Sequence, residues 1–305
     1  MTSEELLRQR QALVHHIFSS EGDEFVGLVR KYCRGGGLAI TPEIIEATHA
    51  QKNEIMGFTW WKFNPGGQAK GRTKKVLYMH GGGWVLTSGI VQYQFAQFLA
   101  QELGCEVWFP EYPLVPENNG KEAIDMVMEL YKMMLKECDG DEIAIGGDSA
   151  GGGLAVSVTA HIIKTGLPKP NTLVLASPGL FDCVQRRNKE EEEYMDVTSA
   201  RDPVVALNAI PTALEYWRGP LDENDYRVNP SRAELKDFPT MLIFAGGYEC
   251  MEKGIRNFVE KAVMEDVDVR YFVRNRKIHN YVLSDPAAKS ERNMIVQRLL
   301  DPDNN

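Results

Sequence analysis

A single serine in a glycine-bounded turn is the strongest sign of chemistry in this chain of 305 residues. Ser149 lies in a Gly-Asp-Ser-Ala-Gly pentapeptide at 147–151, between an apolar run that ends at 146 and a helical pattern that continues to about 164. A serine hydroxyl attacks an acyl carbonyl only when it is exposed, freed of its proton by a base and close to donors for the developing oxyanion. Small residues on both sides allow the tight turn that exposes it. We therefore predict that Ser149 is a nucleophile.

The same glycines have two simpler interpretations, helix packing and phosphate binding. A phosphate-binding loop requires a lysine directly after its last glycine, whereas Leu154 follows Gly153 here. The position of the motif between a strand pattern and a helix pattern favours the nucleophile instead.

A glycine loop upstream supplies the donors that such a nucleophile needs. The sequence His-Gly-Gly-Gly-Trp at 80–84 directly follows the apolar run 75–79. Without a Cβ, three consecutive glycines let backbone N–H groups approach a substrate oxygen. Ala150 adds a donor from the first turn of the helix after Ser149, where the helix dipole also favours negative charge. We expect His80 to shape this loop through hydrogen bonds rather than to act as the base.

The base is expected in a loop after the last apolar run, where His279 lies. In the chain order serine, acid, histidine, this is the position of the base. The five other histidines lie in expected helices, before the first strand or in the glycine loop: His15, His16, His49, His80 and His161. The acid should leave the sheet one strand earlier, because it has to orient the imidazole. Glu249 fits that position after the run 240–245, with Glu252 and Asp237 as alternatives.

These residues require a sheet that positions them, and the chain has the pattern of one. Apolar runs rich in β-branched and aromatic residues alternate with helical patterns. The strands are expected at 58–63, 75–79, 105–109, 142–146, 172–176, 240–245 and 267–273, and the helices near 91–103, 121–137, 150–164, 251–264 and 287–300. This alternation predicts an α/β fold in one domain, with a mostly parallel central sheet flanked by helices on both faces.

Two segments depart from this alternation. Residues 1–48 have helical spacing with one apolar face, so we expect N-terminal cap helices there. From 183 to 226 the strand pattern stops, and we interpret this segment as a cap insertion over the active site. Its charge run at 189–193 is interpreted as a solvated helix face. The core then comprises residues 49–182 and 227–305.

The composition limits the partners of the protein. The formal net charge is -9, and no run of Lys and Arg indicates a nucleic-acid groove. No apolar stretch resembles a membrane span or a secretion signal, so we expect a cytoplasmic protein. Five widely spaced cysteines lack a Cys-x-x-Cys pair, which favours free buried thiols over a metal site. We expect the chemistry to need neither a metal nor a cofactor.

With these residues assembled, the chain resembles the hormone-sensitive-lipase-like carboxylesterases, a family of α/β-hydrolases. The resemblance rests on His-Gly-Gly-Gly-Trp at 80–84, Gly-Asp-Ser-Ala-Gly-Gly at 147–152, Ser177-Pro178 followed by Asp182, and the segment 111–117, which is similar to the family's Tyr-Arg-Leu-Ala-Pro-Glu. Pro113 and Val115 replace the usual Arg and Ala. The tripeptide Glu-Cys-Met at 249–251 stands where Asp-Pro-Leu is commoner.

The resemblance implies a serine ester hydrolase without metal or cofactor. It implies the triad Ser149, Glu249 and His279, and the oxyanion donors Gly82, Gly83 and Ala150. It also implies a lid that combines the N-terminal helices with the insertion at 183–226. An amidase or deacetylase would use the same triad, because both reactions pass through a tetrahedral oxyanion. A non-catalytic ligand-binding receptor on this scaffold is the alternative from another class.

Substrate contacts are expected from apolar and aromatic residues near these motifs, namely Trp84, Leu180, Phe181, Tyr216, Trp217 and Tyr281. The expected partner is a small-molecule ester with a short acyl chain, because the lid should fit closely. The run 267–273 alternates faces like an exposed edge strand, which would allow a homodimer by strand pairing.

Overall fold

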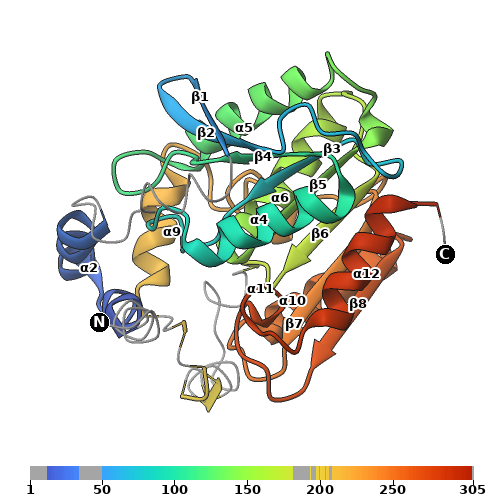
Figure 1. The fold of residues 1–305 in the computed structure, drawn as a ribbon. Helices are drawn as coiled ribbons and strands as arrows, with labels where there is room; N and C mark the ends of the chain where they lie inside the picture. Colours follow the sequence, from blue (N-terminus) through green and yellow to red (C-terminus); the bar gives the residue numbers. More distant parts are fainter. Residues whose placement is uncertain are drawn as a thin grey trace, which may run out of the picture.

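A mostly parallel sheet forms the centre of the structure, a computed structural model that describes residues 12–33, 50–180, 193, 197–198, 200–202, 204–205 and 208–303. Within these residues the sheet has eight strands in the order β1-β2-β4-β3-β5-β6-β7-β8 (Figure 1). Strand β2 is antiparallel to both of its neighbours, β1 and β4, and all other neighbouring strands are parallel. The strands, β1 to β8, are Gln51–Ile55, Phe58–Phe63, Lys75–Met79, Glu106–Pro110, Ile143–Asp148, Thr172–Ala176, Thr240–Gly246 and Val269–Arg274.

Helices cover both faces of the sheet. One face carries α4 (Ile90–Leu103), α11 (Tyr281–Ser284) and α12 (Lys289–Leu300), and the other carries α5 (Gly120–Met134), α6 (Ser149–Lys164) and α10 (Glu252–Met264) (Figure 1). Successive strand residues point to opposite faces. In β5, Ala144 belongs to the apolar core on the α4 and α12 side, and Ile145 to the core on the α5 and α6 side. The predicted α/β architecture with a mostly parallel sheet is therefore confirmed.

The structure departs from the sequence prediction at one strand and at the start of the last helix. Strand β1 was not predicted, because its residues are mostly exposed and carry no apolar run. The last helix begins at Lys289 rather than at 287, because Asp285 closes a turn before it, with its carboxylate accepting the N–H of Ala287 at 2.8 Å. Strands β5, β7 and β8, which lead into the site, lie close to their predicted positions.

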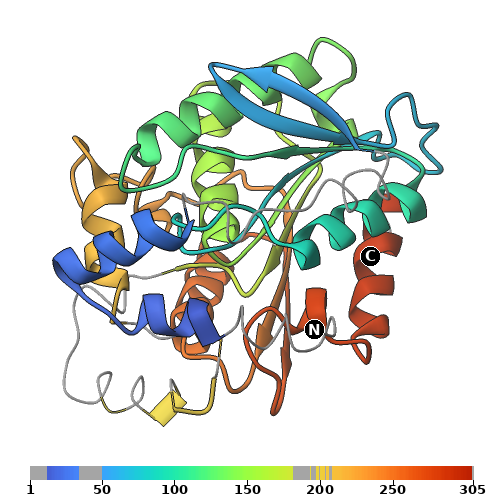
Figure 2. The same ribbon diagram turned by 60° about the vertical axis from the view of Figure 1, so that its left-hand side comes forward.

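The N-terminal helices pack beside a helix from the middle of the chain. Residues 12–18 and α2 (Gly22–Leu28) are helical, and α9 (Ile210–Arg218) lies next to them (Figure 2). The N–H of Ala209 donates to the Phe18 carbonyl at 3.0 Å, and the N–H of Gly22 donates to Thr212 Oγ1 at 3.1 Å. The division into cap and core stays a prediction, because residues 1–11, 34–49 and 181–192, with most of the charge run, lie outside the described residues.

Three negative findings apply to the described part of the chain. None of its helices has the length and apolar character needed to cross a bilayer. None of its His, Cys, Asp and Glu side chains gather in a group of three or more that could hold a metal ion. None of its four cysteines forms a disulfide, and of these Cys33, Cys105 and Cys250 are buried while Cys138 is partly exposed.

A buried ion cluster joins β3 to β4 at their amino ends. Lys75 Nζ donates to Glu106 Oε2 at 2.7 Å, and the other oxygen, Oε1, accepts the N–H of Gly66 at 2.8 Å. Trp108 Nε1 also donates to Glu106 Oε2, at 3.0 Å. Burial alone would raise the pKa of Glu106, but the hydrogen bonds from Lys75, Gly66 and Trp108 outweigh it and lower the pKa from 4.5 to about 2. The charged carboxylate is thus stabilised by folding.

Replacing this carboxylate should cost stability in a pH-dependent way. We expect Glu106→Gln to lower the free energy of unfolding by about 3 kcal/mol at pH 7, because it removes the buried charge that pairs with Lys75. The contribution is fully present above the unfolded pKa and is lost as the pH falls toward the folded one. Urea unfolding at pH 7 and at about pH 4 should therefore show a smaller difference at the lower pH.

Glu137→Gln is the matched control, because Glu137 also contacts Lys75 Nζ, at 2.6 Å, but is half-exposed. We expect Glu137→Gln to lower the free energy of unfolding by less than about 1 kcal/mol. Equal effects of the two substitutions would contradict the assigned importance of burial.

Candidate active site

The predicted nucleophile lies on a strained turn at the end of β5. Ser149 begins α6 with a φ of 52°, a left-handed conformation that side chains other than glycine rarely adopt. The flanking glycines allow the turn to pack closely. A Cβ at Gly147 would lie 2.4 Å from the carbonyl oxygen of Gly151, and a Cβ at Gly151 would lie 2.3 Å from the carbonyl oxygens of Met79 and His80. The turn therefore packs directly against the glycine loop after β3.

The glycine loop presents backbone donors beside this turn. Gly82 and Gly83 have φ values of 122° and 59°, both in the region that favours glycine. The N–H groups of Val85 and Leu86 donate to the Gly82 carbonyl at 3.1 and 3.0 Å, which fixes the loop. The N–H groups of Gly82 and Gly83 have no hydrogen-bond partner among the described residues. They can therefore serve an oxyanion together with the N–H of Ala150, in the first turn of α6.

The predicted base and acid form a buried pair. His279 Nδ1 lies 2.8 Å from Glu249 Oε2, with His279 3% exposed and Glu249 fully buried. The other oxygen of Glu249 accepts the N–H of Gly246 at 3.0 Å. Because Nδ1 contacts the carboxylate, Nε2 is the ring nitrogen left to accept a proton. His279 and Ser149 line the same cavity.

Three carboxylates act on the imidazole of His279. Burial by itself lowers the pKa of an imidazole, because it disfavours the charged form. The hydrogen bond and charge of Glu249, together with the charges of Asp202 and Asp148, outweigh burial and hold the pKa of His279 above its ordinary value of 6.5. The site therefore stabilises a positive charge on this ring.

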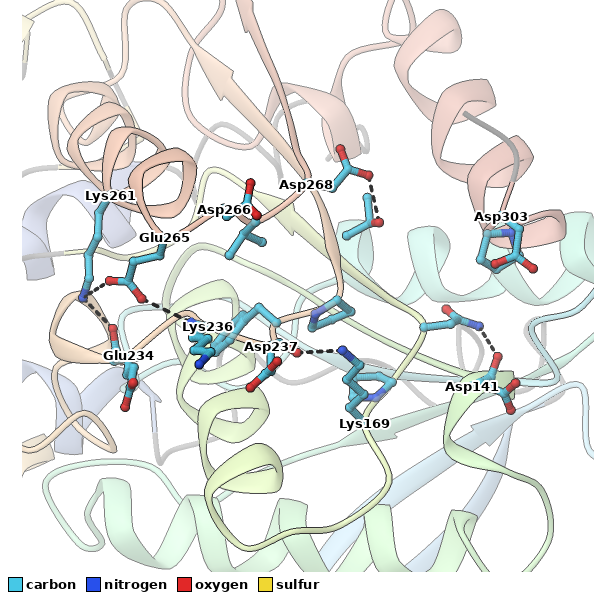
Figure 3. A pocket seen from close by; sticks show the side chains of 18 of the residues that line it. Asp141, Lys169, Glu234, Lys236, Asp237, Lys261, Glu265, Asp266, Asp268 and Asp303 are labelled. Carbon is cyan, nitrogen blue, oxygen red and sulfur yellow. Dashed lines mark hydrogen bonds and ion pairs between the residues drawn. The ribbon is translucent and has the colours of Figure 1, made fainter.

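The two alternative acids lie elsewhere. Glu252 accepts a hydrogen bond from Tyr271 Oη at 3.0 Å and pairs with Arg256 on its own helix. Asp237 lines a larger hollow of about 1070 Å³ where the chain enters β6, β7 and β8 (Figure 3). This edge is opposite to the carboxyl ends of the strands that carry Ser149 and Glu249. The structure thus brings Glu249, and neither alternative, to His279.

Several polar side chains of that larger hollow form hydrogen bonds with neighbouring segments. Lys169 Nζ donates to the carbonyl of Asp237 at 3.0 Å, and Thr240 Oγ1 donates to Asp268 at 2.9 Å (Figure 3). Lys261 Nζ donates to the carbonyl of Ser231 at 3.0 Å. These contacts join the segments that lead into neighbouring strands.

The cavity beside Ser149 is small and apolar. Its volume is about 220 Å³. Among the described residues that line it there is no Asp, Glu, Lys or Arg. Its apolar walls come from the N-terminal helix, the segment that leads into α4, the middle of the chain and the loops after β7 and β8, and include Val14, Phe18, Leu86, Ile90, Val204, Val205, Ile210, Met251, Ile278 and Leu283. Such a cavity suits an uncharged ligand group.

The predicted substrate residues do not line this cavity in the part of the chain that the structure describes. Trp84 is buried and stacks on Trp217 of α9, with ring centroids 5.1 Å apart. Leu180 and Tyr281 are also buried in the packed interior, and Tyr216 is exposed. Phe181 lies outside the described residues. The aromatic pair instead holds α9 against the glycine loop, because large flat rings gain most from packing in the core.

His80 is buried beneath the glycine loop. Its Nδ1 lies 2.7 Å from the carbonyl oxygen of Gly81, and its ring stacks on Tyr112 with centroids 4.5 Å apart. Tyr112 Oη donates to the His80 carbonyl at 2.8 Å. These contacts suit the predicted structural role in shaping the loop.

Sequence reasoning missed Asp148, which precedes the predicted nucleophile. This buried carboxylate accepts Asn280 Nδ2 at 2.8 Å, Gln92 Nε2 at 3.2 Å and Tyr78 Oη at 3.1 Å. Burial raises the pKa of the Asp148 carboxyl above its ordinary range. Asp148 thereby ties the nucleophile turn to α4, to β3 and to Asn280, the neighbour of His279. The only sequence signal was a carboxylate inside an otherwise small and apolar motif.

A parallel sheet with a strained serine turn after β5 defines the α/β-hydrolase fold. The sequence profile of the family described as alpha/beta hydrolase fold matches residues 76–283. The chain belongs to this family.

Several curated relatives align with part of the chain. An esterase from Acinetobacter venetianus is 27% identical over 201 residues, which cover 65% of this chain and 64% of that protein. An acetyl-hydrolase from Streptomyces hygroscopicus is 26% identical over 66% of this chain and 65% of its own length. Hormone-sensitive lipase from Mus musculus is 31% identical over 50% of this chain and 20% of its own. The chain thus aligns with less than two thirds of each of these relatives.

Solved structures show the same fold over nearly the whole chain. An esterase from the bacterial hormone-sensitive lipase family has a TM-score of 0.74 at 22% identity, and the match covers 98% of both chains. Esterase E25 has a TM-score of 0.77 at 20% identity, over 95% of this chain and 89% of that one.

Proposed function

We propose that the protein is a serine carboxylesterase that hydrolyses short-chain acyl esters through an acyl-enzyme on Ser149. One observation carries the proposal: His279, whose Nδ1 lies 2.8 Å from the buried carboxylate of Glu249, lines the same cavity as a serine on a strained turn. The names of the relatives, esterase, acetyl-hydrolase and hormone-sensitive lipase, support ester hydrolysis.

The proposed reaction uses only groups of this chain. His279 Nε2 takes the proton of Ser149 as Oγ attacks the acyl carbonyl. The N–H groups of Gly82, Gly83 and Ala150 hold the oxyanion, and the buried charge of Glu249 stabilises the imidazolium. His279 returns the proton to the leaving alcohol. Water, activated by the same base, then releases the acid from the acyl-enzyme.

The cavity supports a short, uncharged acyl group. Phe18 limits its size, because the ring lies directly over the glycine loop: a Cβ at Gly83 would meet the Phe18 ring at 2.4 Å. Phe18 also lines the cavity with Val14 of the same helix. The N-terminal helix thus closes the cavity above the oxyanion donors.

The mechanism predicts that Ser149→Ala lowers hydrolysis of a p-nitrophenyl ester by about 10⁴-fold or more and abolishes labelling by a fluorophosphonate probe. The substitution removes the attacking oxygen and leaves the fold in place. Steady-state rates and probe labelling check both effects.

Ser157→Ala is the control for that experiment, because Ser157 lies on the same helix and donates to the carbonyl of Tyr226 at 2.8 Å. It should retain both labelling and turnover. A wild-type protein that fails to react with the probe would instead indicate a non-catalytic receptor. Faster hydrolysis of a matched anilide than of the ester would indicate an amidase.

Removing the Phe18 ring should widen the acyl specificity. We expect Phe18→Ala to raise the ratio of octanoate to butyrate hydrolysis, measured as kcat/KM, by about tenfold or more. Phe25→Ala is the matched control, because Phe25 packs on Phe18 with ring centroids 6.2 Å apart and does not line the cavity. An unchanged ratio in Phe18→Ala would refute the assigned role of this ring.

We also propose that the protein forms a homodimer through the edge of the sheet. Strand β8 pairs with β7 on one side and ends the described sheet. Val273 on β8 and Val263 and Met264 at the end of α10 are exposed, Met264 to 87%. Exposed apolar residues beside a strand edge favour pairing with a second copy.

A charge on this edge should weaken the dimer. We expect light scattering to give a dimer mass for the wild type and a monomer mass for Val273→Lys. Met56→Lys, on another exposed apolar residue, in the turn between β1 and β2, should leave the mass unchanged. A monomeric wild type would exclude this proposal.

A further inference from the structure

A buried carboxylate from the middle of the chain reaches the loop that carries the base. Asp202 is 1% exposed and lies in the segment predicted as the cap insertion. Its Oδ2 accepts the backbone N–H of His279 at 3.2 Å, and its Oδ1 accepts the N–H of Val204 at 2.9 Å. The N–H of Asp202 itself donates to the carbonyl of Thr198 at 3.0 Å. The proposed triad does not use this carboxylate.

The two bonds of the Asp202 side chain require a carboxylate. Each oxygen accepts from a different backbone N–H, on segments far apart in the sequence. An asparagine has one acceptor oxygen, so its NH₂ group would face one of the two N–H donors. Leaving a buried N–H unpaired costs free energy. The arrangement is therefore specific to an acidic side chain.

Both segments held by Asp202 border the site. His279 carries the imidazole, and Val204 and Val205 line the cavity. We propose that Asp202 is a positioning residue that fixes the base and the cavity wall relative to each other, and that its charge favours the protonated ring during turnover. This inference rests on the proposed function, because it assumes that His279 is the base.

The effect of the Asp202 charge on the protonated ring can be tested, because the charged groups around His279 set the pKa of that ring. Glu249, Asp202 and Asp148 face the ring from three elements, and all three raise the pKa of His279 against the effect of burial. Two cations that are close in sequence to Asp202 and His279 have other partners: the guanidinium of Arg201 lies 5.9 Å from the Tyr248 ring centre, and Lys277 pairs with Asp285. Removing the Asp202 charge should therefore lower the pKa of His279.

The test compares Asp202→Asn and Asp202→Glu by pH profiles of kcat and kcat/KM on p-nitrophenyl butyrate. The base is active when neutral, so the rate falls as the pH decreases through the pKa of His279. We expect Asp202→Asn to shift this acid limb to lower pH and to reduce kcat by about tenfold or more, because the base is misplaced. Asp202→Glu keeps the charge but is one methylene longer, so it should reduce kcat with the acid limb close to that of the wild type.

Asp222→Asn is the matched control. Asp222 lies in the same predicted insertion and makes the same local bond, with Oδ1 accepting the N–H of the residue two positions on, Asn224, at 2.8 Å. Its side chain is exposed and does not contact His279, so its rates and pH profile should match those of the wild type. If the acid limb of Asp202→Asn lies at the same pH as that of the wild type, the charge of Asp202 does not favour the protonated ring. If its kcat is unchanged, Asp202 does not position the base.

Fluorophosphonate labelling separates this inference from the proposed function. If the wild type reacts with the probe, Ser149→Ala does not, and both Asp202 variants behave like the wild type, only the inference about Asp202 fails. If the wild type does not react, the proposed esterase and the inference fail together. Urea unfolding of each variant identifies a loss of rate that comes from a loss of fold. If Asp202→Asn is unstable, Asp202→Glu, which keeps the charge, is compared with the wild type instead.

Discussion

The close contact between the nucleophile turn and the glycine loop is the constraint on which the rest of the site depends. Gly151 packs against the carbonyl oxygens of Met79 and His80, and β3 pairs with β5 as far as Met79 and Gly147, so the turn after β5 and the loop after β3 are held side by side. The serine and the backbone donors therefore belong to one rigid body. This rigidity matters because stabilisation of an oxyanion requires donors that are in place before charge develops. The left-handed conformation of Ser149 is the strain that accompanies this arrangement.

Buried carboxylates connect the remaining parts to this rigid body. Asp148 joins the nucleophile turn to Asn280, Glu249 holds the ring of His279, and Asp202 holds the backbone of the same residue. Each of these carboxylates accepts hydrogen bonds from polar groups in the interior, so none is left buried without compensation. Their combined negative charge favours a positive imidazole. Geometry and electrostatics are thus supplied by the same side chains.

More of the candidate site than of its surroundings could be predicted from the sequence. The proposed nucleophile, acid and base and the glycine loop follow from local motifs and from their order along the chain, and the structure brings Glu249 to His279. Strand β1 has no apolar pattern and could not be predicted that way. Trp84 and Trp217 have the character of substrate contacts but pack on each other, because only tertiary structure decides which aromatic residues face a cavity. Phe18 and Asp202 reach the site across long sequence distances, which no local pattern reports.

The position of the Phe18 ring also affects how a substrate reaches the cavity beside Ser149. Its ring covers Gly83, while its own backbone carbonyl accepts the N–H of Ala209 just before α9. Any movement that uncovers Gly83 has to displace this ring. It must then either break the hydrogen bond to Ala209 or carry α9 along with the N-terminal helix. Access to the serine is therefore coupled to the contact between two segments that are nearly two hundred residues apart in the chain.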